Sequence, residues 1–246
     1  MLTSVEKMLF LFLALLSVGA AYHGFREMWL TINRGQGKLY LNNLPARAWH
    51  AFTVYITQNT TLKTRRISSL LHLGIVWGFT FYFLVNAIDL LMGYFGGVED
   101  SLKNLGVAYD GYRLLADALS IAVIVGVIYF VVRRYYLPNK KDLTFHDGVL
   151  LHPKVKAGGM SRDSLIVAVF ILIHVGARFL GEAIIVQQQG EADLFMPFAS
   201  IVAPLFAGLS TDGLQLLRHL MWWLALGGIL LFLPYFPYTK HAHLFM

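Results

Sequence analysis

The stretch LLHLGIVWGFTFYFLVNAID, residues 70–89, is almost wholly apolar, with His72 near its start and Asp89 at its end. The hydrocarbon core of a bilayer is about 30 Å thick, and a helix needs about 20 apolar residues to cross it. This stretch meets that requirement. It therefore predicts a membrane-spanning helix, which we place at about residues 67–95.

Four other stretches have similar length and character. Glu6 stands beside Lys7 at the start of the first, where a signal peptide would be clearly positive, so we expect a retained helix and not a cleaved signal. No long polar block separates the apolar runs, so we expect one all-α membrane domain over residues 1–246, an up-and-down bundle. The five predicted helices cover about residues 5–25, 67–95, 112–132, 165–187 and 214–238.

The composition agrees with a membrane protein. The chain is 57% hydrophobic and 14% charged, with a mean hydropathy of +0.60, whereas a soluble domain carries about 25% charged residues. The net charge of +6 does not indicate nucleic acid, because the Lys and Arg residues lie in loops where membrane topology explains them. There is no cysteine, which excludes disulfides, cysteine-ligated iron–sulfur clusters and thiol nucleophiles within this chain.

Basic residues are distributed unequally between the loops. The segment before the third helix has Lys103 alone ahead of Arg113, and the segment 188–212 has no Lys or Arg. By the positive-inside rule the two basic loops are cytoplasmic, so the N-terminus lies outside and the C-terminus inside. We expect the protein in the inner (cytoplasmic) membrane of a prokaryote. These loops contain Arg26, Arg34, Lys38, Arg47, Lys63, Arg65 and Arg66 in one, and Arg133, Arg134, Lys140, Lys141, Lys154, Lys156 and Arg162 in the other.

One loop is unusually apolar. Residues 194–209, LFMPFASIVAPLFAGL, are too apolar for a solvated loop and too interrupted by Pro197 and Pro204 for a span. We expect this segment to lie on the outer interface or to re-enter the membrane under cover of protein.

Histidines within the spans are the main functional signal, because ionisable groups in a membrane are costly. They are His72, His174 and His219, with His241 and His243 at the inner end of the fifth helix. Neutral imidazole is a standard axial ligand of haem iron, and two facing helices can supply a pair. His72 lies six residues after Arg66, or about 9 Å inside the membrane at 1.5 Å per residue, a depth that His241 or His243 can share. The alternative is that His72 bonds a neighbouring helix and that the tail is an interfacial positive cluster.

Several segments together resemble a known family. They are the second helix quoted above, LFLPYFPYTKHAHLF at the end of the fifth, RRYYLPNKKDL after the third and FREMWLTINRG after the first. The chain resembles, over essentially its whole length, the membrane domain of the respiratory nitrate reductase gamma subunit, the heterodisulfide reductase membrane subunit and electron-transfer-flavoprotein:menaquinone oxidoreductases. The last group is the most similar, and H-x-x-I-x-W-G-F and P-Y-[ST]-K-H-x-H are the most specific motifs.

The resemblance implies two haems b stacked across the membrane. The inner one would be bound by His72 and His243, with His241 as the alternative ligand. The usual outer ligands are absent, because Ala225 and Tyr82 occupy their positions. His174 and His219 differ in depth by about 6 Å by helical rise and could form a replacement pair. The alternative roles are a hydrogen bond in the core for His174 and a surface or quinone-site role for His219.

Charged and aromatic residues add further hypotheses. Arg178 and Glu182 are four residues apart and can pair on one helix face. Arg178 could also bind a haem propionate, and Glu182 could take protons from a quinol. We expect Asp89, Arg113 and Asp117 to be interfacial partners. Trp222 and Trp223 are typical of lipid-facing or packing aromatics, and secondarily of a quinone pocket.

These patterns favour a b-type cytochrome subunit that transfers electrons between quinone, expected to be menaquinone, and a cytoplasmic partner. That partner would be a cysteine-rich iron–sulfur protein, either as a separate subunit or as a domain of a longer chain, with an electron-transfer flavoprotein as a further candidate. A haem-poor membrane anchor of a larger redox complex is the alternative, favoured by Ala225 and Tyr82. A transporter is the weakest hypothesis, because no pair of broken helices with inverted symmetry is present.

Overall fold

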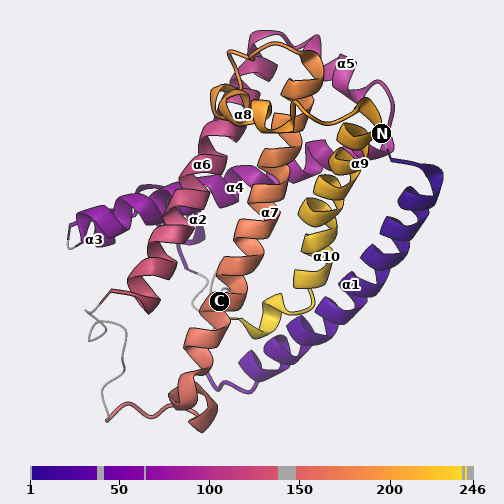
Figure 1. The fold of residues 1–246 in the computed structure, drawn as a ribbon. Helices are drawn as coiled ribbons and strands as arrows, with labels where there is room; N and C mark the ends of the chain where they lie inside the picture. Colours follow the sequence, from indigo (N-terminus) through magenta and orange to yellow (C-terminus); the bar gives the residue numbers. More distant parts are fainter. Residues whose placement is uncertain (1, 38–41, 64, 138–147, 240–241, 243–246) are drawn as a thin grey trace.

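A computed structural model describes residues 2–37, 42–63, 65–137, 148–239 and 242. Within these residues all regular structure is helical, and five helices are long and apolar enough to cross a membrane. This confirms the predicted number of spans and indicates a multi-pass membrane protein. The long helices are α1 (Ser4–Ile32), α4 (Arg66–Tyr94), α6 (Val107–Tyr135) and α7 (Met160–Gln189), and the fifth span consists of α9 (Thr211–Trp222), the π-helical turn η4 (Trp223–Gly227) and α10 (Gly228–Phe232) (Figure 1).

The helices are mostly longer than the apolar stretches that predicted them. α1, α4 and α6 each contain 29 residues, a length of about 43 Å at 1.5 Å per residue. This equals the whole bilayer with its headgroup layers, about 40–45 Å, whereas the apolar stretch reports the hydrocarbon core alone. The predicted bounds 5–25, 112–132 and 165–187 were therefore too short, and the fifth helix ends at Phe232 and not at 238.

Shorter helices connect the long ones. The apolar loop at residues 194–209 contains α8 (Pro197–Val202) and the 3-10 turn η3 (Ala203–Phe206), which lie against α6 and α7 at one end of the bundle (Figure 1). Its interruption by proline into short pieces agrees with the prediction that it does not span. The other short elements are α2 (Leu44–Thr57), α3 (Asn59–Leu62), α5 (Val98–Lys103), the π-helical turn η2 (Val155–Gly159) and the 3-10 turn η5 (Phe236–Tyr238).

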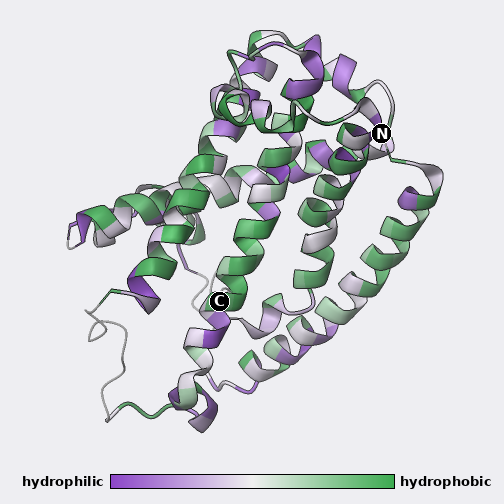
Figure 2. Ribbon diagram, viewed as in Figure 1, coloured by the Kyte–Doolittle hydropathy of each residue, from purple (hydrophilic) through white to green (hydrophobic). Residues whose placement is uncertain are grey.

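Hydrophobic residues run along the long helices, and hydrophilic residues gather at the ends of the bundle (Figure 2). One end carries α5 and α8, and we call it the α5 end. α1, α6 and α9 begin here, while α4 and α7 end here. The Leu2 amide donates to the Gly93 carbonyl at 3.0 Å, and the Tyr94 hydroxyl donates to the Lys7 carbonyl at 2.7 Å. These bonds join the start of α1 to the end of α4.

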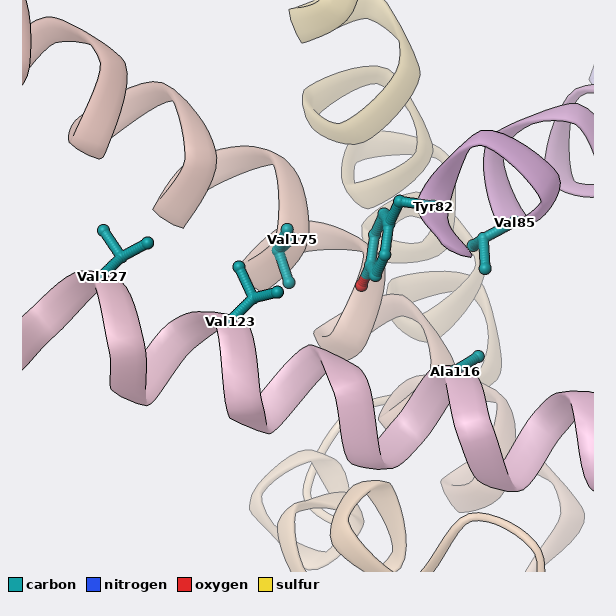
Figure 3. Packing of buried hydrophobic residues seen from close by; sticks show 6 residues of the cluster. All are labelled: Tyr82, Val85, Ala116, Val123, Val127 and Val175. Carbon is teal, nitrogen blue, oxygen red and sulfur yellow. The ribbon is translucent and has the colours of Figure 1, made fainter. Parts of the chain in front are cut away.

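α4 and α6 approach each other closely through glycines. A methyl group on Gly126 would lie 2.9 Å from the Leu71 carbonyl oxygen, so only glycine permits this backbone separation. Further along the same two helices, Tyr82 of α4 reaches between α6 and α7, and its hydroxyl bonds Ser120 at 2.8 Å (Figure 3). Val85 of α4 faces Ala116 of α6 in the same buried cluster.

α1 lies along the other side of the bundle, beside α10 (Figure 1). Its start is stabilised by a capping box in which Thr3 and Glu6 bond each other's backbone amides. Further along, the Ser17 hydroxyl donates to the Leu230 carbonyl at 2.7 Å. Gly24 lies against Pro237, where a methyl group would be 2.8 Å from the proline ring. α1 is therefore attached to α10 along its middle and to η5 near its end.

α2 was not predicted from the sequence. It is amphipathic, and none of its residues is buried. Its end is attached to α4, because the Trp77 indole donates to the Ile56 carbonyl at 2.9 Å and the hydroxyls of Tyr55 and Thr80 bond each other at 2.7 Å.

The close contact between α4 and α6 can be tested with Gly126→Ala. The added methyl group would press on the Leu71 carbonyl, and overpacking of this kind costs about 1–3 kcal/mol. We expect a lower thermal unfolding midpoint for the protein in detergent. Gly111→Ala on the same helix is the matched control, because nothing lies within 4 Å of its added methyl group. Equal midpoints for both variants would contradict the packing described here.

Candidate functional site

An ion cluster lies inside the bundle near the α5 end. Arg178 of α7 donates from Nε to the Asp89 carboxylate of α4 at 3.1 Å and pairs through Nη2 with Glu182, one turn further along α7, at 2.9 Å. The Arg178 side chain is 9% exposed. The predicted pairing of Arg178 with Glu182 is therefore present. Asp89, which we expected to be an interfacial partner, instead joins this cluster of three, which we call the Arg178 cluster.

Packing of α9 against α4 completes the surroundings of the cluster. The Trp222 indole donates to the Asp89 backbone carbonyl at 3.3 Å. Its ring lies over Gly93, where an added methyl group would be 3.1 Å from the indole. Phe10 of α1 packs edge-on against the same ring, with centroids 5.0 Å apart. Trp222 is therefore a packing residue, one of the roles that the sequence predicted for it. It also lines the cavity described next.

A cavity of about 300 Å³ opens beside the cluster, and we call it the Trp222 cavity. Apolar residues from α4, α7 and α9 form much of its wall, and Gly181 gives it space on α7. Its polar groups include Arg178, Glu182 and His219. Ligand sites in proteins are typically concave and mostly apolar, with a few polar groups that orient the ligand. The Trp222 cavity has this composition and lies at the lower end of the usual size range.

A second cavity, of about 190 Å³, adjoins the cluster, and we call it the Tyr112 chamber. Asp89, Arg178 and Glu182 line both cavities, so the cluster lies between them. Most of the chamber lining is charged or polar. The Tyr112 hydroxyl is buried and has no hydrogen-bond partner in the described part of the chain. Asn86 Oδ1 is likewise buried without a described partner, although it lines neither cavity.

Further charges surround the chamber towards the α5 end. Arg113 pairs with Asp193 and, more loosely, with Asp110. The Asp117 carboxylate accepts the backbone amides of Phe198 and Ala199 at 2.7 and 3.1 Å, at the start of α8. Arg113 and Asp117 thus hold the segment after α7 in place.

α5 carries a second ion pair at this end. Lys103 pairs with Glu99 at 2.8 Å, and this hydrogen bond holds the pKa of the Glu99 carboxyl below its usual range. Glu99 lines both cavities and is partly exposed. It is therefore expected to be ionised at neutral pH, at the border between the cavities and solvent.

His219 lies on the border between α9 and the start of α1. Its Nδ1 contacts the Glu6 carboxylate at 2.9 Å, and its Nε2 contacts the Gln215 amide nitrogen at 3.0 Å. Glu6 also accepts a hydrogen bond from the Trp223 indole at 3.1 Å. Both ring nitrogens of His219 are therefore engaged, in an arrangement that attaches α1 to the fifth span.

His174 is buried on α7, one turn before Arg178. Its Nδ1 bonds the Ala225 carbonyl of η4 at 2.9 Å, and its ring is stacked on Phe170 with centroids 5.7 Å apart. A π-helical turn such as η4 changes the backbone pairing of a helix locally and is often associated with a functional site. Nδ1 bonded to a carbonyl is also the usual way in which a histidine is oriented for ligation through Nε2. The geometry is equally that of a hydrogen-bonded core histidine, the alternative prediction.

His174 and His219 each have their own hydrogen-bond partners in the structure. Ligation of a haem by His219 would require loss of its bond to Glu6 or Gln215. The His174 ring lies between Phe170 and Tyr82, with ring centroids 5.7 and 5.6 Å away, so a haem bound by His174 alone also stays a prediction. The outer haem bound by both residues remains a prediction that this geometry does not favour.

His72 lies near the beginning of α4, at the opposite side of the bundle from the Arg178 cluster. Its exposed imidazole meets Phe130 of α6 edge-on, with centroids 6.1 Å apart. The proposed second ligands, His241 and His243, lie outside the described residues. Ala242 between them is buried. The haem bound by His72 therefore stays a prediction, because the residues expected to supply its second ligand lie outside the described part of the chain.

Sequence reasoning missed three parts of the site: Asp89 as a partner of Arg178, the unpartnered Tyr112 hydroxyl and the chamber that Tyr112 lines. Asp89 had a usable signal, because a carboxylate inside a predicted span is a functional hypothesis by default. Its partner could not be identified, since pairing depends on which helices adjoin. Tyr112 had no signal in the sequence.

Comparison with known proteins gives two distant relatives. Over 225 residues, 89% of this chain, it is 24% identical to the EtfAB:quinone oxidoreductase of Syntrophomonas wolfei subsp. wolfei, of which it covers 29%. Over 201 residues, 79% of this chain, it is 25% identical to the probable iron–sulfur-binding oxidoreductase FadF of Bacillus subtilis, of which it covers 25%. The chain thus spans less than a third of either relative. No protein-family profile matches it, and no solved structure does. Both relatives are oxidoreductases, which is consistent with a redox subunit.

The importance of Arg178 for the bundle can be tested with Arg178→Leu. Removal of one partner from a buried ion pair leaves uncompensated charge and costs about 3–5 kcal/mol. We expect a strongly lowered thermal unfolding midpoint, and partial recovery when Asp89→Asn and Glu182→Gln remove the orphaned charges. Arg26→Leu is the control, because its pair with Glu27 is exposed and such pairs contribute about 0–1 kcal/mol. A midpoint for Arg178→Leu equal to that of the control would contradict a stabilising role.

Proposed function

We propose that this chain is the membrane-embedded electron-transfer subunit of a quinone oxidoreductase. It exchanges electrons between quinone and an iron–sulfur or flavoprotein partner. The observation that carries the proposal is the Arg178 cluster, an ion network inside a membrane bundle that forms part of the wall of a ligand-sized cavity. The names of the two relatives supply the redox class and the quinone.

The Trp222 cavity has the chemistry that a quinone head group needs. Its apolar wall accommodates the ring, and the Arg178 guanidinium can donate to a quinone carbonyl oxygen. The Glu182 carboxylate can accept a proton from a quinol hydroxyl. Oxidation of a quinol to a quinone breaks two O–H bonds and releases two protons and two electrons. The cavity therefore requires a group that accepts protons during quinol oxidation and donates them during quinone reduction, and Glu182 is positioned to be that group.

His72 is the residue that we assign to a haem b, with His243, or alternatively His241, as the second axial ligand. A bound haem would supply one-electron transfer between the two-electron quinone and the partner. The chain's own contribution is to present imidazoles from two helices and to keep water from the ring. The soluble partner would dock near His72, on the side that the basic loops assign to the cytoplasm, and the quinone, expected to be menaquinone, would come from the bilayer.

A haem-poor anchor for a larger redox complex is the second proposal. It is favoured by the engagement of both nitrogens of His219 and by the structural roles of Tyr82 and Ala225, which bond Ser120 and His174. In this case the Arg178 cluster would serve to hold the bundle together. The presence or absence of a bound tetrapyrrole distinguishes the two proposals.

The haem assignment predicts an optical signature. A dithionite-reduced minus oxidised spectrum should show a b-type haem, with at least one haem per chain by pyridine haemochrome. His72→Ala should remove one haem per chain, while His50→Ala on the exposed α2 should remove none. A second haem in the wild type would indicate a site at His174. A protein without haem would overturn the cytochrome proposal and leave the anchor.

The quinone assignment predicts a specific loss of turnover in Glu182→Gln. Direct proton transfer by a positioned carboxylate contributes about 10²–10⁴ in rate. We expect haem reduction by menadiol, a soluble naphthoquinol, to slow by about 10²-fold or more, with haem content unchanged. Glu191→Gln, exposed after the end of α7, should retain the wild-type rate. Wild-type turnover in Glu182→Gln would exclude Glu182 as the base.

A further inference from the structure

Each quinol releases two protons, but the Arg178 cluster is already neutral after it has taken up one. Its two carboxylates and one guanidinium sum to one negative charge when all are ionised. The first proton must therefore leave the cluster before the second can be accepted. The Trp222 cavity also reaches charged residues at the α5 end, such as Glu99 and Arg218. The quinol itself would occupy this cavity, however, so a separate exit is needed.

The Tyr112 chamber offers the alternative. It shares the Arg178 cluster with the Trp222 cavity and extends past Tyr112 to Lys103 and Asp110 at the α5 end. The Lys103 side chain is 56% exposed and Asp110 is 31% exposed. The chamber thus reaches from the buried carboxylates to groups that meet solvent.

The chamber is suited to water and not to an organic ligand. Its volume of about 190 Å³ accommodates about six waters at ~30 Å³ each, and its polar lining can hold them. Tyr112 lines the chamber, and its buried hydroxyl has no hydrogen-bond partner in the described chain. A buried polar group that lacks a protein partner costs free energy, and a bound water is the usual explanation.

We propose that the Tyr112 chamber is a hydrated proton path that serves the quinone site, an inference that rests on the proposed function. Tyr112 orients a water that takes each proton from Glu182 and passes it through the chamber to Asp110 and bulk solvent. The two protons follow one another, and the two electrons would pass singly through the proposed haem to the iron–sulfur or flavoprotein partner. In the direction of quinone reduction the same path supplies both protons.

Charged groups from each surrounding element face the path. Besides Arg178 and Glu182 of α7 and Asp110 of α6, these are Asp89 from α4, Glu99 and Lys103 from α5, Arg113 and Asp117 from α6, Asp193 after α7 and Arg218 from α9. Arg113 is bound to Asp193, and Asp117 to the start of α8. Tyr112 is therefore a positioning residue for water among groups that are largely fixed, and it does not contact the quinone.

The test is Tyr112→Phe in the full chain, assayed for haem reduction by menadiol. The variant removes a hydroxyl that makes no described bond, so its fold should be retained. We expect kcat to fall about tenfold, less than the factor of 10²–10⁴ of a direct proton acceptor, with KM unchanged and a changed solvent deuterium isotope effect. Tyr136→Phe, exposed at the end of the same helix, is the control and should match the wild type.

The outcomes separate this inference from the proposed function. If menadiol does not reduce the wild-type protein, the proposed function fails and the path has no role. If the wild type turns over and Tyr112→Phe has the same kcat and isotope effect, the inference alone is overturned. A high-resolution map is a second measurement, independent of turnover. An ordered water bound to the Tyr112 hydroxyl supports the chamber, and an anhydrous chamber overturns it.

Discussion

The α5 end of the bundle depends on the two ion pairs of the Arg178 guanidinium. This guanidinium joins α7 to α4 through Asp89 and binds Glu182 on its own helix. Charges inside a membrane bundle are costly and are retained where they pair or act in function. In this cluster the pairing is unequal, because two carboxylates share one guanidinium. A single proton on either carboxyl would balance the charge, so the same arrangement that holds two helices together also provides a place for one proton beside a cavity.

Two kinds of helix contact divide the structure. α4 and α6 meet through Gly78 and Gly126, where an added methyl group would collide with the neighbouring helix. Near the α5 end, long polar side chains and Trp222 connect the helices, and the two cavities lie there. Helices that meet through small residues leave no cavity between them, whereas an arginine side chain that joins two helices keeps their backbones apart. The tight packing of α4 on α6 therefore fixes the position of Asp89, and the arginine bridge leaves room for a ligand on one side and water on the other.

The sequence predicted the structural features that depend on a single helix. Five spans and the pairing of Arg178 with Glu182 follow from length, apolarity and a separation of four residues. Helix ends were predicted less well, because helices continue through the headgroup layers, and the 14-residue amphipathic α2 is below the length of a span. Contacts that depend on which helices are neighbours could not be predicted. Tyr82 and Ala225 were noted only as missing haem ligands, yet Tyr82 bonds Ser120 and the Ala225 carbonyl bonds His174.

The distance between the two proposed sites links the number of haems to the place where quinone reacts. His72 and Asp89 lie on the same helix, seventeen residues apart, which corresponds to about 25 Å of helical rise. Quinone at the Arg178 cluster and a haem at His72 would therefore need a further carrier between them. His174 lies at the right level, one turn before Arg178, with Nδ1 fixed by the Ala225 carbonyl. The proposed quinone site at the cluster therefore predicts a second carrier, and the haem content per chain tests it. A single haem at His72 would instead place quinol oxidation near that haem and leave the Arg178 cluster with a structural role.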